Sequence, residues 1–209
     1  MYKLIAAKPV HAKQILSYFT KTCYWKEAVD SNTQNKKYED FMLEWIINPR
    51  LPLTTILVKE NEEDSVQGCI ITATTDRLAK MPNFSPYLHP RVIEAFKNWF
   101  AFSVSDGVMV DLIFVEEELR GKGYGSKLYQ VAENLAKKEG KDCISGFIWS
   151  FSPNALINAT RRGRMVKACI DFPLIDLPLL YVEKKPEYIL LKNYFQSEQY
   201  LKIPNMLLT

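Results

Sequence analysis

The sequence predicts an α/β fold, in which helices cover a central sheet. Three observations support this prediction. Short runs rich in apolar and β-branched residues alternate along the 209 residues with segments whose apolar residues recur every three or four positions. A run with three glycines in five positions lies between one such strand and one such helix. With 47% hydrophobic residues the chain can bury one core but not two large ones, so we expect a single domain over residues 1–209.

The first half of the chain predicts a strand, two amphipathic helices and a hairpin. Tyr2–Ala6 is the expected first strand. The helices are expected where apolar residues have helical spacing: Ala12, Ile15, Leu16, Phe19 and Cys23 in the first, and Tyr38, Phe41, Met42, Trp45 and Ile46 in the second. Pro49 ends the second helix. Thr54–Val58 and Cys69–Thr75 are expected to form the hairpin around the charged turn Glu60–Ser65.

A segment of about residues 78–105 is longer than the usual connection between elements. Its proline-rich part, Met81–Pro90, predicts a loop, and the apolar residues that follow at helical spacing predict another amphipathic helix. Such an insertion would cover a substrate site, pad the sheet or form a contact between two copies in a homodimer. The sequence favours none of these three roles over the others.

The second half predicts a strand and a helix, followed by a strand–helix–strand–strand series. Val108–Val115 is the expected core strand, and Ser126–Lys138 is the expected helix, with Leu128, Ala132 and Ala136 on its buried face. The remaining expected elements are a strand at Cys143–Trp149, a short helix from Pro153 to Gly163, and closing strands at Met165–Ile170 and Tyr188–Tyr194, joined by a proline-containing arm.

The run Arg120-Gly121-Lys122-Gly123-Tyr124-Gly125-Ser126 predicts a phosphate-binding turn. Glycine permits positive φ and lets backbone N–H groups approach a ligand closely. The helix that follows adds unpaired N–H donors and a partial positive charge, which together attract phosphate. The order Gly125-Ser126-Lys127 does not fit the ATP/GTP loop, and the spacing G-x-G-x-G does not fit the dinucleotide fingerprint. A plain connection between strand and helix is the alternative interpretation.

Arg120, Gly123 and Gly125 also meet the pattern [R/Q]-x-x-G-x-[G/A]. Together with the strand before it and the helix after it, over Val108–Gly140, this pattern resembles the pyrophosphate-binding motif of the GCN5-related N-acetyltransferase (GNAT) superfamily. The resemblance implies a mixed, mostly antiparallel central sheet flanked by helices, with the segment at about 78–105 inserted before the core strand.

The resemblance further implies an acyl-CoA-dependent N-acetyltransferase that moves an acetyl group from acetyl-CoA, as co-substrate, directly to a primary amine in a ternary complex. It implies that backbone groups of the core strand hold the pantetheine arm and that amides of the turn hold the pyrophosphate. The implied binding residues are Ile113, Phe114 and Val115 for pantetheine, Gly121, Lys122, Gly123, Tyr124, Gly125 and Ser126 for pyrophosphate with Arg120 nearby, and Asn154 for the distal part of the arm.

Acetyl transfer to an amine also requires a proton acceptor. Releasing the proton of an alkyl ammonium at neutral pH costs about 4 kcal/mol. Asp111 is the first candidate for the general base, because a carboxylate inside an apolar strand needs a reason to be there. A satisfied structural carboxylate is the alternative. Glu116, Glu117 and Glu118 follow the strand, where they would attract a cationic substrate or form an ordinary solvated turn.

The sequence departs from the family pattern at Ala159, where many members carry a tyrosine that protonates the leaving thiolate. A positioned general acid contributes roughly 10²–10⁴-fold to the rate. Water or another hydroxyl, from Ser152 or Tyr129, would have to serve instead. Otherwise the protein is slow or acts on an unusual acceptor, or it is a catalytically silent relative that binds an acyl-CoA or another protein.

The charge, hydrophobicity and cysteine spacing of the chain argue against nucleic-acid-binding, membrane-spanning, secreted and metal-binding proteins. A net charge of +3 is too small to imply nucleic-acid binding, and no apolar run approaches the roughly 18 residues that span a bilayer. The N-terminus does not resemble a signal peptide, so we expect a cytoplasmic protein. Four widely separated cysteines and two histidines have no metal-site spacing, so we expect no metal. The basic run Arg161–Arg164, with Lys167, falls beside the expected cofactor site; it is either a solvated face or a surface for an acidic partner.

Overall fold

The computed structural model describes residues 1–22, 38–79, 106–150, 153–172 and 177–184. The strands of this part form one seven-stranded sheet in the order β1-β2-β3-β4-β5-β7-β6. Neighbouring strands are antiparallel, except that β4 and β5 are parallel. The predicted mixed, mostly antiparallel sheet is therefore confirmed. Its strands are β1 (Tyr2–Ala6), β2 (Thr54–Lys59), β3 (Glu62–Thr74), β4 (Val108–Val115), β5 (Ile144–Trp149), β6 (Met165–Phe172) and β7 (Leu177–Lys184).

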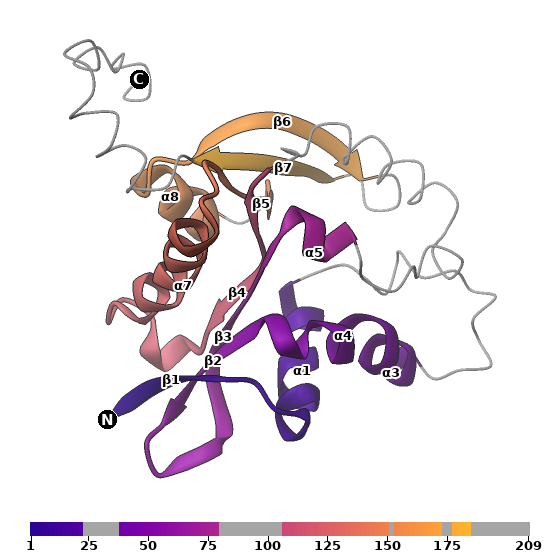
Figure 1. Ribbon diagram of the computed structural model, residues 1–209, viewed down its shortest axis with the longest axis vertical. Coiled ribbons are helices and arrows are strands. Elements are labelled where there is room, and N and C mark those ends of the chain that lie inside the picture. Colours follow the sequence, from indigo (N-terminus) through magenta and orange to yellow (C-terminus); the bar gives the residue numbers. More distant parts are fainter. Residues whose placement is uncertain (23–37, 80–105, 151–152, 173–176, 185–209) are drawn as a thin grey trace.

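Helices cover both faces of the sheet (Figure 1). On one side lie α1, α3, α4 and the π-helix η3, and on the other side lie α7 and α8. None of the described helices is long and apolar enough to cross a membrane. The helical segments are η1 (Pro9–His11), α1 (Ala12–Thr22), α3 (Tyr38–Phe41), η3 (Met42–Ile47), α4 (Asn48–Arg50), η4 (Leu51–Leu53), α5 (Thr75–Ala79), η6 (Glu117–Leu119), α7 (Tyr124–Glu139) and α8 (Pro153–Arg161).

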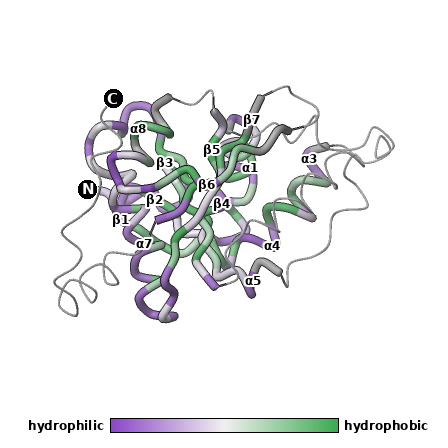
Figure 2. Tube along the Cα trace, turned by 90° about the horizontal axis from the view of Figure 1, so that it is seen from above, coloured by the Kyte–Doolittle hydropathy of each residue, from purple (hydrophilic) through white to green (hydrophobic). Residues whose placement is uncertain are grey.

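Hydrophobic clusters lie on both faces of the sheet, because successive side chains of a strand point to opposite faces. Ile15 and Phe19 of α1 pack with Leu112 of β4 on one face. On the other face the predicted apolar stripe of α7, which includes Leu128 and Ala132, packs against β3 and β4. Figure 2 shows the hydrophobic colour concentrated on the central strands and the hydrophilic colour toward the periphery. The core thus fixes α7, and with it the glycine turn, against the middle of the sheet.

Strand β4 diverges from β5 halfway along its length. The two strands pair only from Val108–Ile144 to Val110–Gly146, whereas β4 continues to pair with β3 as far as Val115. The β3–β4 register skips Asp111, since Ile71 lies opposite Leu112 and Thr72 lies opposite Val110. An extra residue of this kind is a β-bulge, which bends a strand and increases its twist. The bulge therefore lies where β4 turns away from β5.

One strand prediction was wrong in its bounds, and one strand was not predicted. Strand β3 begins at Glu62 rather than Cys69, because the far end of the hairpin extends into solvent, where polar residues are tolerated in a strand. Strand β7 lies within the segment predicted as an arm, and it inserts between β5 and β6. The closing strand predicted at residues 188–194 and the insertion at 80–105 lie outside the described residues.

Candidate functional site

The glycine turn between β4 and α7 has the left-handed backbone that its sequence predicts. Gly121 has φ 75° and Gly123 has φ 84°, and Gly123 is the N-cap of α7. A side chain at either position would meet no atom within 4 Å, so the strain of a substitution would come from the backbone angle alone. The turn makes no side-chain hydrogen bond to cap the helix. No side chain of the described residues therefore competes with a ligand for the N–H groups of the turn.

Four of the six predicted phosphate-binding amides lack an acceptor within the described residues: those of Gly121, Gly123, Tyr124 and Gly125. The other two are used inside the turn. Lys122 donates to the Leu119 carbonyl at 3.4 Å, and Ser126 donates to the Gly123 carbonyl at 3.1 Å. Free amides at the N-terminus of a 16-residue helix carry a partial positive charge. The arrangement is suited to an anion such as a phosphate.

Beside this turn, the end of β4 has one main-chain edge that no strand of the described residues pairs with. The Glu116 amide donates to Gln67 of β3 at 2.9 Å, and the Phe114 carbonyl lies against Gly68 of β3. Since main-chain groups alternate between the two edges of a strand, those of Ile113 and Val115 face the edge from which β5 has diverged. Phe114 is the exception among the three residues predicted to hold an extended ligand, because its main-chain N–H and C=O groups face β3.

Arg120 folds back onto this strand end. Its Nε donates to the Val115 carbonyl at 3.0 Å, and its guanidinium lies 5.7 Å from the centre of the Phe114 ring. The side chain is exposed, so it can also contact a ligand in the turn. At the other end of the turn, the Tyr124 ring contacts Tyr2 of β1 edge to face at 5.2 Å. Both contacts hold the turn in place against the sheet.

Three elements converge at Gly125. A Cβ built on this glycine would lie 3.9 Å from Nη2 of Arg162 and 4.0 Å from Cγ2 of Val115. Arg162 follows α8, and its Nη2 donates to the Ser126 hydroxyl at 3.1 Å. The sequence analysis places the basic run of this arginine beside the expected cofactor site, but it does not single out Arg162 or its contact with Ser126. Only the packing of α8 beside α7 brings the two together.

Cations surround the ring of Tyr129, which is buried on α7. The guanidinium carbons of Arg162 and Arg164 lie 4.9 and 4.5 Å from the ring centre, and Lys184 Nζ lies 5.1 Å from it. Arg164 Nε donates to the Tyr129 hydroxyl at 3.3 Å. Burial raises the pKa of Tyr129, and the charge of Arg164 opposes this shift. Burial also lowers the pKa of Arg162, with a further contribution from Arg164.

Asp111, the predicted general base, is paired with a buried arginine. Its Oδ2 accepts a hydrogen bond from Arg50 Nε at 2.6 Å. The Arg50 side chain is 8% exposed and that of Asp111 is 22% exposed. Arg50 also donates to the Ile46 carbonyl at 3.0 Å. The pair anchors the β4 bulge to α4, which gives Asp111 a structural role whether or not it accepts a proton.

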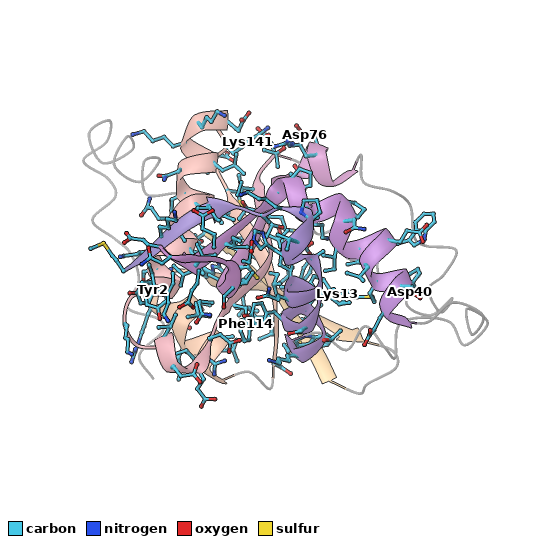
Figure 3. The ribbon with its side chains drawn as sticks, turned by 90° about the horizontal axis from the view of Figure 1, so that it is seen from below. Tyr2, Lys13, Asp40, Asp76, Phe114 and Lys141 are labelled. Carbon is cyan, nitrogen blue, oxygen red and sulfur yellow. The ribbon has the colours of Figure 1, made fainter. Side chains whose placement is uncertain are left out.

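Tyr18 of α1 packs on the face of the sheet opposite α7. Its ring stacks on Phe114 with centres 4.2 Å apart, and its hydroxyl donates to the Val66 carbonyl at 2.6 Å. Burial raises the pKa of Tyr18 far above its ordinary value, and the neighbouring Glu116 carboxylate adds to the shift. Figure 3 shows Phe114 near α1, which carries Lys13, and away from the end of the sheet at Lys141. A carboxylate and two aromatic rings therefore lie at the β4 end on this face.

The position of the expected tyrosine is filled by apolar packing. Ala159 is buried on α8 against Ile148 and Val182, so it brings no hydroxyl to the site. Asn154 is in the first turn of α8, but its side chain and Ser152 lie outside the described residues. Within the described part of the chain, no group of three or more His, Cys, Asp or Glu residues is placed to hold a metal ion.

Comparison with known proteins gives a consistent result. The family model described as "Acetyltransferase (GNAT) family" matches residues 19–156. A curated relative, acetyltransferase Atu2258 of Agrobacterium fabrum, is 41% identical over 54 residues. That match spans 26% of this chain and 38% of the relative. It is therefore a likeness of one segment rather than of the whole protein.

Solved structures show the same fold at low sequence identity. A structure titled as an acetyltransferase matches with a TM-score of 0.60 at 16% identity, covering 88% of this chain and 99% of its own. Arabidopsis thaliana Naa50, solved with the bisubstrate analogue CoA-Ac-MVNAL, matches with a TM-score of 0.55 at 14% identity. That likeness covers 88% of this chain and 97% of Naa50.

Proposed function

Because the chain belongs to the acetyltransferase (GNAT) family, we propose that it transfers an acetyl group from acetyl-CoA to a primary amine. One observation carries the proposal most: within the described part of the chain, the amides of Gly121, Gly123, Tyr124 and Gly125 at the start of α7 have no acceptor. Such amides suit the diphosphate of a CoA thioester. The edge of β4 at Ile113–Val115 supports the placement, because within the described residues β5 does not pair with it and an extended pantetheine arm could pair there as an added strand would, although Arg120 Nε already donates to the Val115 carbonyl.

We propose direct transfer in a ternary complex. The amine nitrogen attacks the thioester carbonyl, a C–N bond forms, the C–S bond breaks, and the amine loses a proton. The Glu116 carboxylate would attract the protonated amine toward the Phe114 face of β4. Asp111, at the bulge of the same strand, remains the proposed acceptor of the amine proton. Its pairing with Arg50 makes this role testable separately from its structural role.

The leaving thiolate also needs a proton. With Ala159 at the expected position, we propose that water supplies it, or the Tyr129 hydroxyl. A thiol with an ordinary pKa near 8.5 is a tolerable leaving group, so transfer does not require a dedicated acid. Tyr129 accepts a hydrogen bond from Arg164, which leaves its own phenolic proton available for donation.

Calorimetry with acetyl-CoA tests the binding step. We expect saturable binding in the micromolar range, and no binding at sub-millimolar ligand would contradict the proposal. Gly123→Asp should abolish binding, because it places a carboxylate where the phosphates would lie. Gly140→Asp is the matched control: Gly140 also has positive φ, 66°, with no atom near its missing Cβ, but it lies at the opposite end of α7.

A second candidate function is that of a silent relative that binds an acyl-CoA without turnover. The buried Ala159 favours it, because the residue at the position of the expected tyrosine has no hydroxyl. Measuring thiol release from acetyl-CoA with a panel of small amines and peptide N-termini separates the two candidates. Binding without any amine-dependent release would favour the silent relative. Release with any of these amines would establish the transferase.

A further inference from the structure

Three cations and one carboxylate meet at the α7–α8 contact. Lys184 is buried and pairs with the buried Glu133. Arg162 and Arg164 both lie within 5 Å of the Tyr129 ring centre, and the described residues place no carboxylate in an ion pair with either of them. Their proximity is costly, since each guanidinium raises the energy of the other in a half-buried setting. The positive end of α7 adds to the same local field.

The two arginines differ in what they face. Arg164 is directed inward: its Nε is bonded to the Tyr129 hydroxyl, and its Nη1 lies 3.9 Å from a Cβ built on Gly146. Arg162 is directed toward the glycine turn. Its Nη2 is bonded to Ser126 and reaches within 3.9 Å of the Cβ position of Gly125. Arg162 is therefore the arginine that borders the free amides of the turn.

We propose that Arg162 is a phosphate ligand of the acyl-CoA, contacting its diphosphate from the α8 side while the amides of Gly121–Gly125 hold it from the α7 side. This inference rests on the proposed function. The planar guanidinium has further N–H donors besides the one bonded to Ser126, and its geometry matches phosphate. An anion in this place would also relieve the repulsion between Arg162 and Arg164.

The proposal gives the diphosphate two kinds of ligand at the turn, backbone amides and one charged side chain. Backbone amides alone would bind the diphosphate in any chain that makes this bend. A side chain from the following helix adds charge, so CoA affinity becomes strongly dependent on one residue and on salt. Removing a charge-assisted hydrogen bond is expected to weaken binding about 10- to 100-fold. Screening by salt should reduce the contribution further.

The test is calorimetry of Arg162→Gln with CoA and with dephospho-CoA, which lacks the 3′-phosphate. We expect the same weakening, about 10- to 100-fold, for both ligands, because both carry the diphosphate. The matched control is Arg161→Gln, which removes the same charge from the exposed neighbouring residue and should change affinity less than about threefold. Arg162→Lys should recover part of the loss, since it restores the charge without the planar fork.

Three results would overturn the inference. These are equal affinity of Arg162→Gln and the unaltered protein, an equal loss in Arg161→Gln, or a loss for CoA that disappears with dephospho-CoA. The last result would place Arg162 on the 3′-phosphate instead. If Arg162→Gln does not fold, the CoA affinity of Arg162→Lys and the salt dependence of CoA binding by the unaltered protein test the same contact. Failure of the unaltered protein to bind CoA at all would instead remove the proposed function.

Discussion

Removing the Arg50–Asp111 ion pair should cause a loss of stability whose size can be worked out from the structure. In Asp111→Asn the amide oxygen can still accept from Arg50 Nε, but the guanidinium loses the negative charge of this partner while its side chain stays 8% exposed. Breaking a buried ion pair on one side costs about 3–5 kcal/mol. Because Asp111 retains 22% exposure, we expect the lower end, about 3 kcal/mol.

Urea unfolding followed by circular dichroism measures this loss. With a slope of about 2–3 kcal/mol per molar urea, the midpoint should fall by roughly 1–1.5 M. Lys3→Gln is a suitable control, because its pair with Glu63 is exposed and its loss should leave the midpoint nearly unchanged. A midpoint for Asp111→Asn within about 0.2 M of the unaltered protein would refute the structural role of the pair.

The double variant Arg50→Met, Asp111→Leu separates stability from catalysis. Replacing a buried ion pair by apolar residues is often neutral or stabilising, so the midpoint should recover most of the loss. If Asp111 accepts the amine proton, turnover should stay about 10²–10⁴-fold below that of the unaltered protein even though the fold is restored. Recovery of turnover together with stability would contradict Asp111 as the general base.

Three further predictions test other parts of the structure. Gly125→Ala should change the free energy of unfolding by no more than about 0.5 kcal/mol, since the new Cβ makes only ordinary contacts with Arg162 and Val115. It should nevertheless weaken acetyl-CoA binding in calorimetry, because the new methyl group lies between the residues that we propose to bind the coenzyme. Unchanged affinity would argue against the proposed binding site. Glu133→Gln should lower the free energy of unfolding by about 3 kcal/mol, because Lys184 would keep a buried charge without its partner, and an unchanged urea midpoint would contradict this. Burial raises the pKa of Cys143 to about 12, so at pH 8 its thiolate fraction is about 10⁻⁴ and iodoacetamide should modify the exposed Cys169 before Cys143, as peptide mass analysis would show.

Much of the architecture follows from local pattern. The stripe of α7 at Leu128, Ala132 and Ala136 repeats at helical spacing, and the structure buries all three. The left-handed φ of Gly121 and Gly123 is likewise a local property, because few residues other than glycine adopt it. Strand β7 was missed because Pro178, near its start, resembles a break in the chain. Its partners β5 and β6, rather than its own sequence, make it a strand.

The sequence by itself determined the glycine turn at Arg120–Ser126, since its glycines permit positive φ and the first amides of the following helix have no intrahelical acceptor. Only the tertiary structure decided what surrounds the turn. No periodicity in the sequence predicts that Arg162 reaches Ser126 or that Arg50 meets Asp111, because these pairs are separated by 36 and 61 residues. Such contacts depend on how helices pack on a bulged and divergent strand, and packing over long separations is a property of the whole fold.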